Sequence, residues 1–312
     1  MKYRQFGNTG LRVSQLGFGC GQLAGTVERQ DHKEAVRTLE LALDRGVNYF
    51  DTADIYAQGR CEELLGKTFQ RQRSSVILAS KAGYRLSRAG SFAARLKPFV
   101  RPLLSIVPGL RKSAQKIRGS QMSQEFSGPY LRSALEASLQ RLRTDYLDLF
   151  QLHSPSATVL EAGEYIETLE KLKAEGKIRY YGVSCATVSD AGHCLAHESI
   201  SAVQIPVNLL NYDEASGFLK RARRSNLAVV ARQPFASGVL AGHPAGQKLA
   251  SPTRTIAQAA IQFTLQAPAV SLVLPGMSSR AHLEENLRAP EAPALTEDEI
   301  EALTASLASP TT

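Results

Sequence analysis

Short apolar runs alternate along the chain with longer segments in which apolar residues recur every three or four positions. The short runs indicate buried strands, and the longer periodic segments indicate amphipathic helices. Strands that alternate with helices favour a parallel sheet, and eight such runs match the strand number of a (β/α)8 TIM barrel, an α/β fold. The predicted strands are 15–19, 47–51, 76–80, 146–151, 178–183, 202–206, 227–231 and 270–274.

Turn-forming and helix-capping residues lie between the predicted strands. The sequence NTG at 8–10 supplies a turn, which predicts a short N-terminal β-hairpin before the barrel. Polar caps, capping boxes and a proline in the first turn mark helix starts. The predicted start signals are Asp31 with Glu34, Pro129, Asp213 for EASGFLKRARR, and Thr296 with Glu299 for a last helix.

Length and composition favour a single enzyme-sized domain. The chain has 312 residues, of which 43% are hydrophobic, and barrels of about 250 residues or more form one domain, so we expect one domain over 1–312. No apolar run reaches the ~18–20 residues of a membrane span and the start lacks the apolar core of a signal peptide, which favours the cytoplasm. The cysteines show neither CxxC pairs nor metal-ligand spacing with histidine, so we expect reduced thiols and no metal site. They are Cys20, Cys61, Cys185 and Cys194.

Three polar residues each sit at the carboxyl end of a separate predicted strand, namely Asp51, Lys81 and His153. The carboxyl ends of parallel barrel strands open into one mouth, where such barrels carry their chemistry. Tyr56 lies five residues beyond Asp51 and can join them there. Each of these residues alone is more often structural than catalytic. Together, an acid, a phenol, an amine and an imidazole make a site that delivers a proton to a carbonyl oxygen.

The order Asp-x4-Tyr, then Lys, then His resembles the catalytic tetrad of the aldo-keto reductase superfamily. The resemblance extends over nearly the whole chain, through YRQFGNTGLRVSQLGFG, FDTADIY, RTDYLDLFQLH, GKIRYYGVS, VQIPVNLLN and LPGMSSRAHLEENL. It implies a (β/α)8 barrel that reduces an aldehyde or a ketone with NADPH.

The tetrad residues have distinct expected roles in such a reduction. Tyr56 is the predicted general acid, and because an unperturbed phenol has a pKa of about 10, a nearby cation is needed to ease proton release. Lys81 supplies that cation, and Asp51 holds its amine in place. His153, if it is neutral, donates a second hydrogen bond that orients the carbonyl oxygen.

Hydride must come from a cofactor, because no side chain donates one. No GxGxxG follows a predicted strand, so a Rossmann site is not indicated. The resemblance implies instead an extended nicotinamide dinucleotide across the mouth, with Ser184 and Gln204 at the carboxamide. Cys185 stands where the family usually has Asn. Arg232 stands where an aromatic often stacks on the nicotinamide, and a guanidinium plane can stack similarly.

The resemblance places the phosphates and the adenine beside the last two strand ends. The family usually has Lys where Gly276 stands and often has Arg where His282 stands, but hydroxyls and an Arg near a helix start suit a phosphate. We therefore expect NADPH rather than NADH. The expected contacts are Phe235, Ser237, Gly238 and Leu240 after the seventh strand, Gly276, Ser278, Ser279 and Arg280 after the eighth, and Glu285 with Asn286 at the adenine.

A long basic insertion, 85–127, follows the third predicted strand. It interleaves cations with apolar residues. Between positions 84 and 124 there are nine Lys and Arg and no acid, so subtracting nine from the chain's formal charge of +8 leaves −1 elsewhere. A flexible solvated loop, a lid that recognises an acidic substrate, and contact with an anionic membrane all remain open. The cations are Arg85, Arg88, Arg95, Lys97, Arg101, Arg111, Lys112, Lys116 and Arg118.

Two other classes of protein compete with the reductase. The barrel can be a cofactor-bound regulatory or scaffolding subunit, or a peripheral membrane protein in which the insertion does the work. A small-molecule carbonyl compound is the expected partner, and nucleic acid is not expected because the basic run carries no known binding motif. Consumption of NADPH with a panel of carbonyl compounds separates the reductase from both alternatives.

Overall fold

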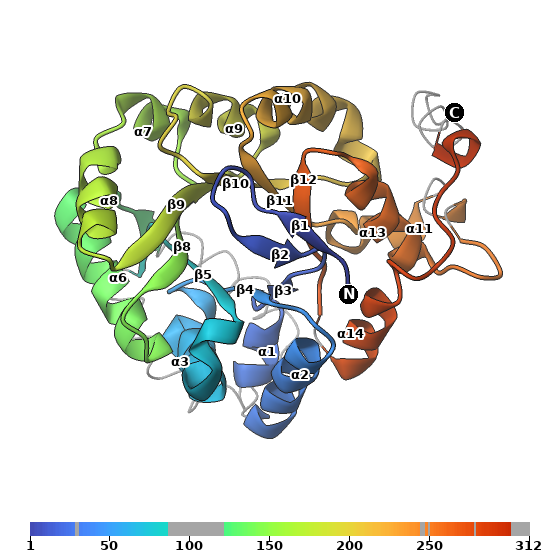
Figure 1. Cartoon of the computed structure of the whole chain (residues 1–312), viewed down its shortest axis with the longest axis horizontal. Coiled ribbons are helices and arrows are strands. Elements are labelled where there is room, and N and C mark those ends of the chain that lie inside the picture. The colour runs from blue at the N-terminus through green and yellow to red at the C-terminus, as the bar shows by residue number, and fades with distance from the viewer. Residues whose placement is uncertain (29–30, 87–121, 244–246, 249, 278, 301–312) are drawn as a thin grey trace, which may run out of the picture.

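Eight parallel strands form a barrel in the computed structural model, which describes residues 1–28, 31–86, 122–243, 247–248, 250–277 and 279–300 (Figure 1). The strands pair in the order β12-β11-β10-β9-β8-β5-β4-β3. The N–H of Gly17 donates to the carbonyl of Val273, and the N–H of Val273 donates to that of Gln15, both at 2.9 Å, which closes the barrel. The strands are β3 (Phe18–Gly19), β4 (Tyr49–Asp51), β5 (Ile77–Ala82), β8 (Leu147–His153), β9 (Ile178–Ser184), β10 (Ala202–Pro206), β11 (Ala228–Arg232) and β12 (Val270–Leu274).

An antiparallel hairpin covers the amino-terminal end of the barrel. Its strands, β1 (Tyr3–Gln5) and β2 (Arg12–Ser14), lie across the centre of the view in Figure 1. Phe6 and Val13 pack with residues of the barrel strands, including Tyr49, in one buried cluster. This end is therefore plugged by apolar side chains, and the predicted hairpin is confirmed.

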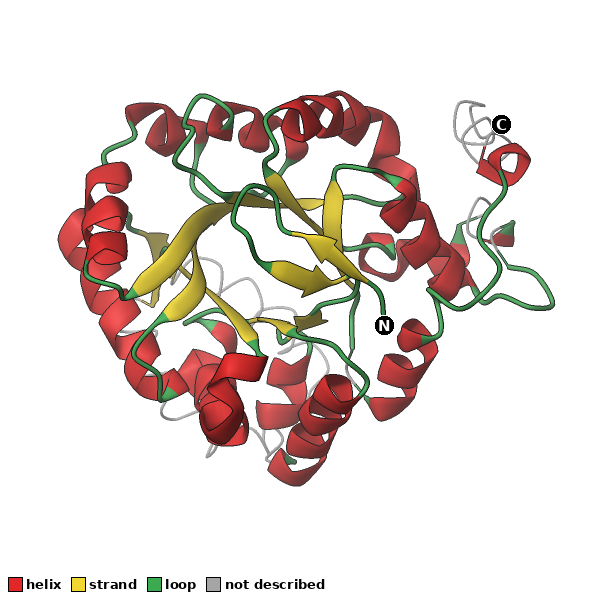
Figure 2. Cartoon of the chain, viewed as in Figure 1, coloured by secondary structure: helices red, strands yellow, loops and turns green. Residues whose placement is uncertain are grey.

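Helices form the outer layer around the strands (Figure 2). Helix α2 buries one face, on which Ala35, Thr38, Leu39 and Ala42 are buried at helical spacing. The helices are α1 (Leu23–Glu28), α2 (His32–Asp44), α3 (Arg60–Phe69), α6 (Gly128–Leu142), α7 (Ala157–Ala162), α8 (Tyr165–Ala174), α9 (Val188–Cys194), α10 (Tyr212–Arg224), α11 (Val239–Gly242), α13 (Ile256–Gln266) and α14 (Arg280–Leu287). Short 3-10 helices are η1 (Tyr56–Gly59), η2 (Gln70–Ser75), η3 (Leu209–Asn211) and η4 (Ala236–Gly238).

Three of the four predicted helix starts agree with the structure, and one does not. Asp31 caps α2 by accepting from the N–H of Glu34, and α6 has a proline in its first turn. The two bonds of a capping box join Thr296 and Glu299 at 2.8 and 3.2 Å. The prediction that Asp213 caps a helix is wrong, because α10 begins one residue earlier and Asp213 lies inside its first turn. There its negative charge still faces the favourable end of the helix.

The insertion leaves the barrel where the sequence predicted, directly after β5. Its base is a two-stranded antiparallel ribbon of β6 (Tyr84–Leu86) and β7 (Met122–Gln124). Residues 87–121, which carry most of its cations, lie outside the described residues, so its role stays a prediction.

Among the described residues, no helix combines the length and the apolarity that a membrane span requires.

Candidate active site

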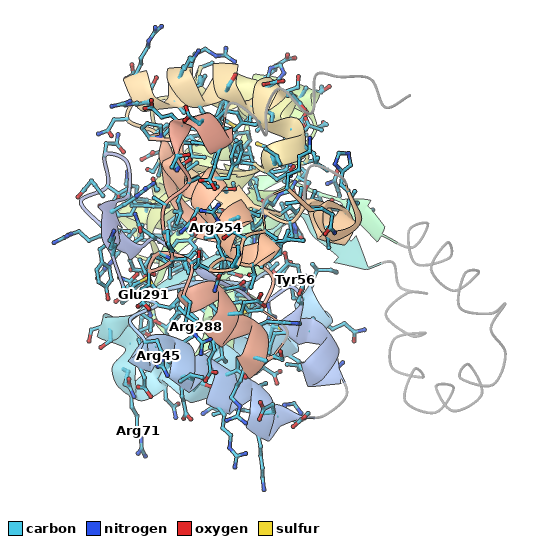
Figure 3. The ribbon with its side chains drawn as sticks, turned by 90° about the vertical axis from the view of Figure 1, so that its right-hand side faces the viewer. Arg45, Tyr56, Arg71, Arg254, Arg288 and Glu291 are labelled. Carbon is cyan, nitrogen blue, oxygen red and sulfur yellow. The ribbon has the colours of Figure 1, made fainter. Side chains whose placement is uncertain are left out.

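The structure brings the four predicted tetrad residues together at one end of the barrel. Asp51 and His153 are the last residues of β4 and β8, and Lys81 is the last but one of β5. Tyr56 begins η1, in the loop that follows β4. Figure 3 views the barrel from the side and places Tyr56 toward the end opposite the hairpin.

A buried ion pair forms the floor of this site. The Nζ of Lys81 lies 2.5 Å from Oδ1 of Asp51 and donates to the carbonyl of Thr52 at 2.8 Å. Gln151 donates to the second oxygen of Asp51 at 3.4 Å. Burial lowers the pKa of Lys81, but the charges of Asp51 and Tyr56 and the hydrogen bond to Asp51 raise it above its ordinary value. The amine therefore stays charged, and its position is fixed.

Tyr56 lies beside this charged amine, with Nζ of Lys81 5.2 Å from the centre of its ring. Lys81 has the largest influence on the pKa of Tyr56 and lowers it, as the sequence predicted. Burial and the charges of Asp51 and Cys20 oppose this effect, so the pKa of Tyr56 lies above its ordinary value. The phenol therefore keeps its proton at neutral pH, as a general acid must.

The imidazole of His153 is held neutral between two aromatic rings. Burial, with the charges of Lys81 and Arg232, lowers its pKa to about 3. The ring of Tyr56 meets it edge-on with centroids 5.9 Å apart, and that of Tyr84 does so at 4.8 Å. Its Nδ1 is buried and has no hydrogen-bond partner among the described residues. A neutral imidazole carries one N–H, which can donate a hydrogen bond to a carbonyl oxygen.

A cavity of about 1120 Å³ runs from the tetrad across the mouth of the barrel. Ser184, Gln204 and Arg232 line it close to the tetrad end. The Oε1 of Gln204 is buried without a partner among the described residues, which is the state expected of a group that accepts from a ligand amide. Arg232 donates to the carbonyls of Cys185 and Ala186 at 2.9 and 2.8 Å, so its guanidinium is held in place.

The side chain of Cys185 points away from the cavity. Its Sγ is buried 3.9 Å from Sγ of Cys194, within the core between strands and helices. Its N–H donates to the carbonyl of Gln204 at 2.9 Å, and its own carbonyl holds Arg232. Cys185 therefore shapes the site through its backbone, and the thiol does not reach a ligand. All four cysteines are buried, and none of them forms a disulfide.

The far end of the cavity is built by the loops that follow β11 and β12. Ser237 and Gly238 adopt positive φ angles of 56° and 93°, which turns their backbone sharply. A Cβ at Gly276 would lie 2.6 Å from the amide of Gln22, so a larger residue there requires Gln22 to move. The predicted contacts that line this end are Phe235, Ser237, Gly238, Leu240, Gly276, Glu285 and Asn286.

Two residues that were predicted to contact the phosphates do not line the cavity. Ser279 caps α14 by accepting from the N–H of His282 at 3.3 Å, and it does not line the cavity. Arg280 also does not line it, because its guanidinium is paired with Glu34 at 2.8 Å. Ser278 lies outside the described residues.

Sequence reasoning missed several residues of the site. Gln22 and Ser154 follow strand ends, so the rule that barrel loops carry function could have found them. Tyr84 packs on His153 from the base of the insertion, and the start of α13 contributes Thr255 and Ile256. Nothing in the local sequence marks those positions.

Comparison with known proteins agrees with this geometry. The model of the "Aldo/keto reductase family" matches residues 15–308. The chain is 32% identical to the uncharacterised oxidoreductase YqkF of Bacillus subtilis, over 97% of this chain and 95% of that protein. The holo form of aldo-keto reductase AKR11C1 from Bacillus halodurans superposes with a TM-score of 0.81 at 29% identity, covering 100% of this chain and 97% of the other.

A second solved structure is an aldo-keto reductase from Klebsiella pneumoniae in complex with NADPH. It superposes with a TM-score of 0.72 at 25% identity and covers 100% of this chain and 97% of the other. The family model spans most of the chain, and the tetrad, the closed barrel and the cavity at its mouth are all present. The chain therefore belongs to the aldo/keto reductase family of oxidoreductases.

Proposed function

We propose that this chain reduces an aldehyde or a ketone to an alcohol, with hydride from NADPH and a proton from Tyr56. The observation that carries the proposal is the buried pair of Lys81 and Asp51 beside Tyr56, with His153 held neutral at the same mouth. When bound, the reduced nicotinamide supplies hydride to the carbonyl carbon, which no side chain can do.

The side chains act on the carbonyl oxygen, where negative charge develops. Tyr56 donates its proton to this oxygen, and the charge of Lys81 stabilises the phenolate that remains. Asp51 keeps the amine in position through its 2.5 Å contact. A ring N–H of neutral His153 donates a second hydrogen bond, which orients the carbonyl before the transfer.

The cavity also suits the dinucleotide. Ser184 and the unpartnered oxygen of Gln204 would hold the carboxamide of the nicotinamide, and the fixed guanidinium of Arg232 would lie against its ring. The loops after β11 and β12 would hold the phosphates through backbone groups, with Glu285 and Asn286 near the adenine. The NADPH complex of the Klebsiella relative supports this choice of cofactor.

A carbonyl panel tests the proposal. Purified protein mixed with NADPH and a set of aldehydes and ketones should oxidise NADPH and form an equal amount of alcohol. The product is measured by gas chromatography beside the loss of cofactor absorbance. Failure to reduce any carbonyl compound, with NADPH still bound, would contradict the proposal and favour a regulatory barrel.

A further inference from the structure

A second cavity, of about 610 Å³, lies beside the tetrad. It is lined by the loop that follows β4, by β6 and the residue after β7, and by one face of α6. Tyr56 lines the first cavity, and its neighbour Ile55 lines the second. Tyr84, which packs edge-on against His153, also lines the second. The two cavities have no lining residue in common within the described part of the chain, so the second is a separate space that adjoins the tetrad.

One acid in this cavity, Asp54, forms no ion pair with any of the described residues. Its Oδ1 is buried and receives no hydrogen bond from them. The cations that line the cavity or influence Asp54 are each paired with a different acid already. Asp54 therefore adds a negative charge that no ion pair in the described part of the chain neutralises. The existing pairs are Arg85 with Glu125, Arg141 with Glu62 and Lys81 with Asp51.

The rest of the wall favours an apolar group that carries a positive charge. The guanidinium of Arg85 lies 5.7 Å from the centre of the Tyr130 ring, so this ring already attracts a cation. Burial and the charge of Asp54 raise the pKa of Tyr130 to about 12, so its phenol stays neutral at physiological pH. Small residues at helical spacing on α6 leave room for a ligand and add apolar surface. They are Ser133, Ala134 and Ala137.

We propose that this cavity is a second ligand site, which binds a small organic cation such as an amine attached to an apolar ring. The ammonium group donates to the carboxylate of Asp54, whose buried charge then gains the partner that it lacks. The apolar body lies against the rings of Tyr84 and Tyr130. A volume of about 610 Å³ is within the usual range for sites of small ligands. An anion is disfavoured, because it meets the charge of Asp54 and must compete with Glu125 for Arg85.

The titration of Asp54 gives this site a characteristic pH dependence. Burial and the charge of Glu62 raise the pKa of Asp54 to about 7, although the charge of Arg141 lowers it. The carboxylate is therefore charged above about pH 7 and neutral well below it, whereas a primary amine keeps its charge throughout this range. Tyr130 stays neutral, and Arg85 lowers the pKa of Glu125, so neither changes its charge between pH 6 and 8. The charged and titratable groups around Asp54 are Glu62, Arg141, Lys81, Tyr130, Arg85 and Glu125.

Three probes of similar size and different charge test the proposal, namely benzylamine, benzyl alcohol and benzoate. Their Kd values are measured by ligand-observed NMR titration. At pH 8, benzylamine should bind about ten-fold more tightly than either of the others, and its Kd should weaken about ten-fold between pH 8 and pH 6. Asp54→Asn keeps the shape of the side chain but removes its charge. This variant should bind benzylamine about ten-fold more weakly at pH 8 and should lose the pH dependence.

Two further variants locate the bound amine. Glu63→Gln removes an acid from an exposed position on α3 and should change the Kd of benzylamine by less than about 1.5-fold. Ala134→Leu fills the cavity without a change of charge and should abolish the binding of benzylamine. The proposal is overturned if benzoate binds as tightly as benzylamine, or if either Asp54→Asn or Ala134→Leu binds benzylamine like the wild type. These measurements need neither NADPH nor turnover, so a failure of the proposed function would leave their outcome unchanged.

Discussion

The two ends of the barrel treat their buried polar groups differently. At the amino-terminal end, both oxygens of Asp148 are occupied, by Arg73 at 2.8 Å, the N–H of Leu78 at 2.9 Å and Arg179 at 3.0 Å. The ring of Tyr146 lies between the two guanidinium groups, 4.0 and 4.5 Å from their central carbons. The buried carboxylate at this end therefore has all its bonding capacity used by partners among the described residues.

At the carboxyl end of the barrel, several buried polar atoms make no hydrogen bond within the described residues. The Nδ1 of His153, the Oε1 of Gln204 and the Oδ1 of Asp54 have no hydrogen-bond partner among the described residues. Burial and the charge of Glu62 raise the pKa of Asp54 to about 7. An unpaired buried polar atom costs free energy, so a cluster of them persists where a ligand completes the bonding. The end with these open atoms is the one that we propose binds cofactor and substrate.

Replacement of Tyr56 by Phe should give the largest loss of activity. The ring remains but the proton is gone, so kcat should fall by on the order of 10²–10⁴, with NADPH binding and thermal stability nearly unchanged. Stopped-flow turnover and cofactor titration measure the two effects. Tyr165→Phe is the matched control, because it removes another buried hydroxyl that has no partner among the described residues. Near-normal kcat in Tyr56→Phe would show that another residue is the acid.

At the opposite end, replacement of Asp148 by Ala should reverse this pattern. It removes a carboxylate that is 1% exposed and leaves the guanidinium of Arg73 without its ion-pair partner, so the free energy of unfolding should fall by about 3 kcal/mol. The folded fraction should keep its kcat within about two-fold. Urea unfolding and turnover below the transition measure both. Asp44→Ala on the exposed end of α2 should change stability by less than about 0.5 kcal/mol. A loss of kcat without a loss of stability would contradict the division between the ends.

The depressed pKa of His153 makes the stability of the folded chain depend on pH. Its ordinary value of 6.5 falls to about 3 in the folded chain, so only the unfolded chain gains this proton between those values. Its stabilising contribution is full above about pH 6.5 and is lost as the pH falls toward 3, with a slope of up to about 1.4 kcal/mol per pH unit. His153→Gln should flatten the dependence of unfolding free energy on pH, and His197→Gln should not. Parallel curves for His153→Gln and the wild type would show that His153 does not resist protonation.

Alternation of strands and helices could be read from the sequence because the barrel strands are short, mostly apolar runs. The predicted strands 202–206 and 270–274 match β10 and β12 at both ends. The predictions 15–19 and 47–51 are too long, because β3 covers only Phe18–Gly19 and β4 covers only Tyr49–Asp51. Apolar character marks burial there, and burial continues beyond the paired residues.

The tetrad positions could likewise be predicted, since strand ends share one mouth. The alternation of side chains along β9 could also have shown that Cys185 points away if Ser184 points inward. The pairing of Arg280 with Glu34 could not be predicted from the sequence, because 246 positions separate the two residues and only the closed barrel brings α14 to α2. Contacts made by closure leave no local pattern in the sequence.

The smallest expected effect concerns the stacking on Tyr146 at the amino-terminal end of the barrel. Tyr146→Leu keeps an apolar side chain but removes the ring that faces Arg73 and Arg179. Cation–π contacts at partly exposed sites contribute about 0.5–1 kcal/mol, so the free energy of unfolding should fall by about 1 kcal/mol. The carboxylate of Asp148 still holds both guanidinium groups, and for that reason the loss should be smaller than in Asp148→Ala. Calorimetry of both variants and the double variant measures the coupling. Fully additive losses would mean that the ring acts by packing alone and does not help to orient the arginines.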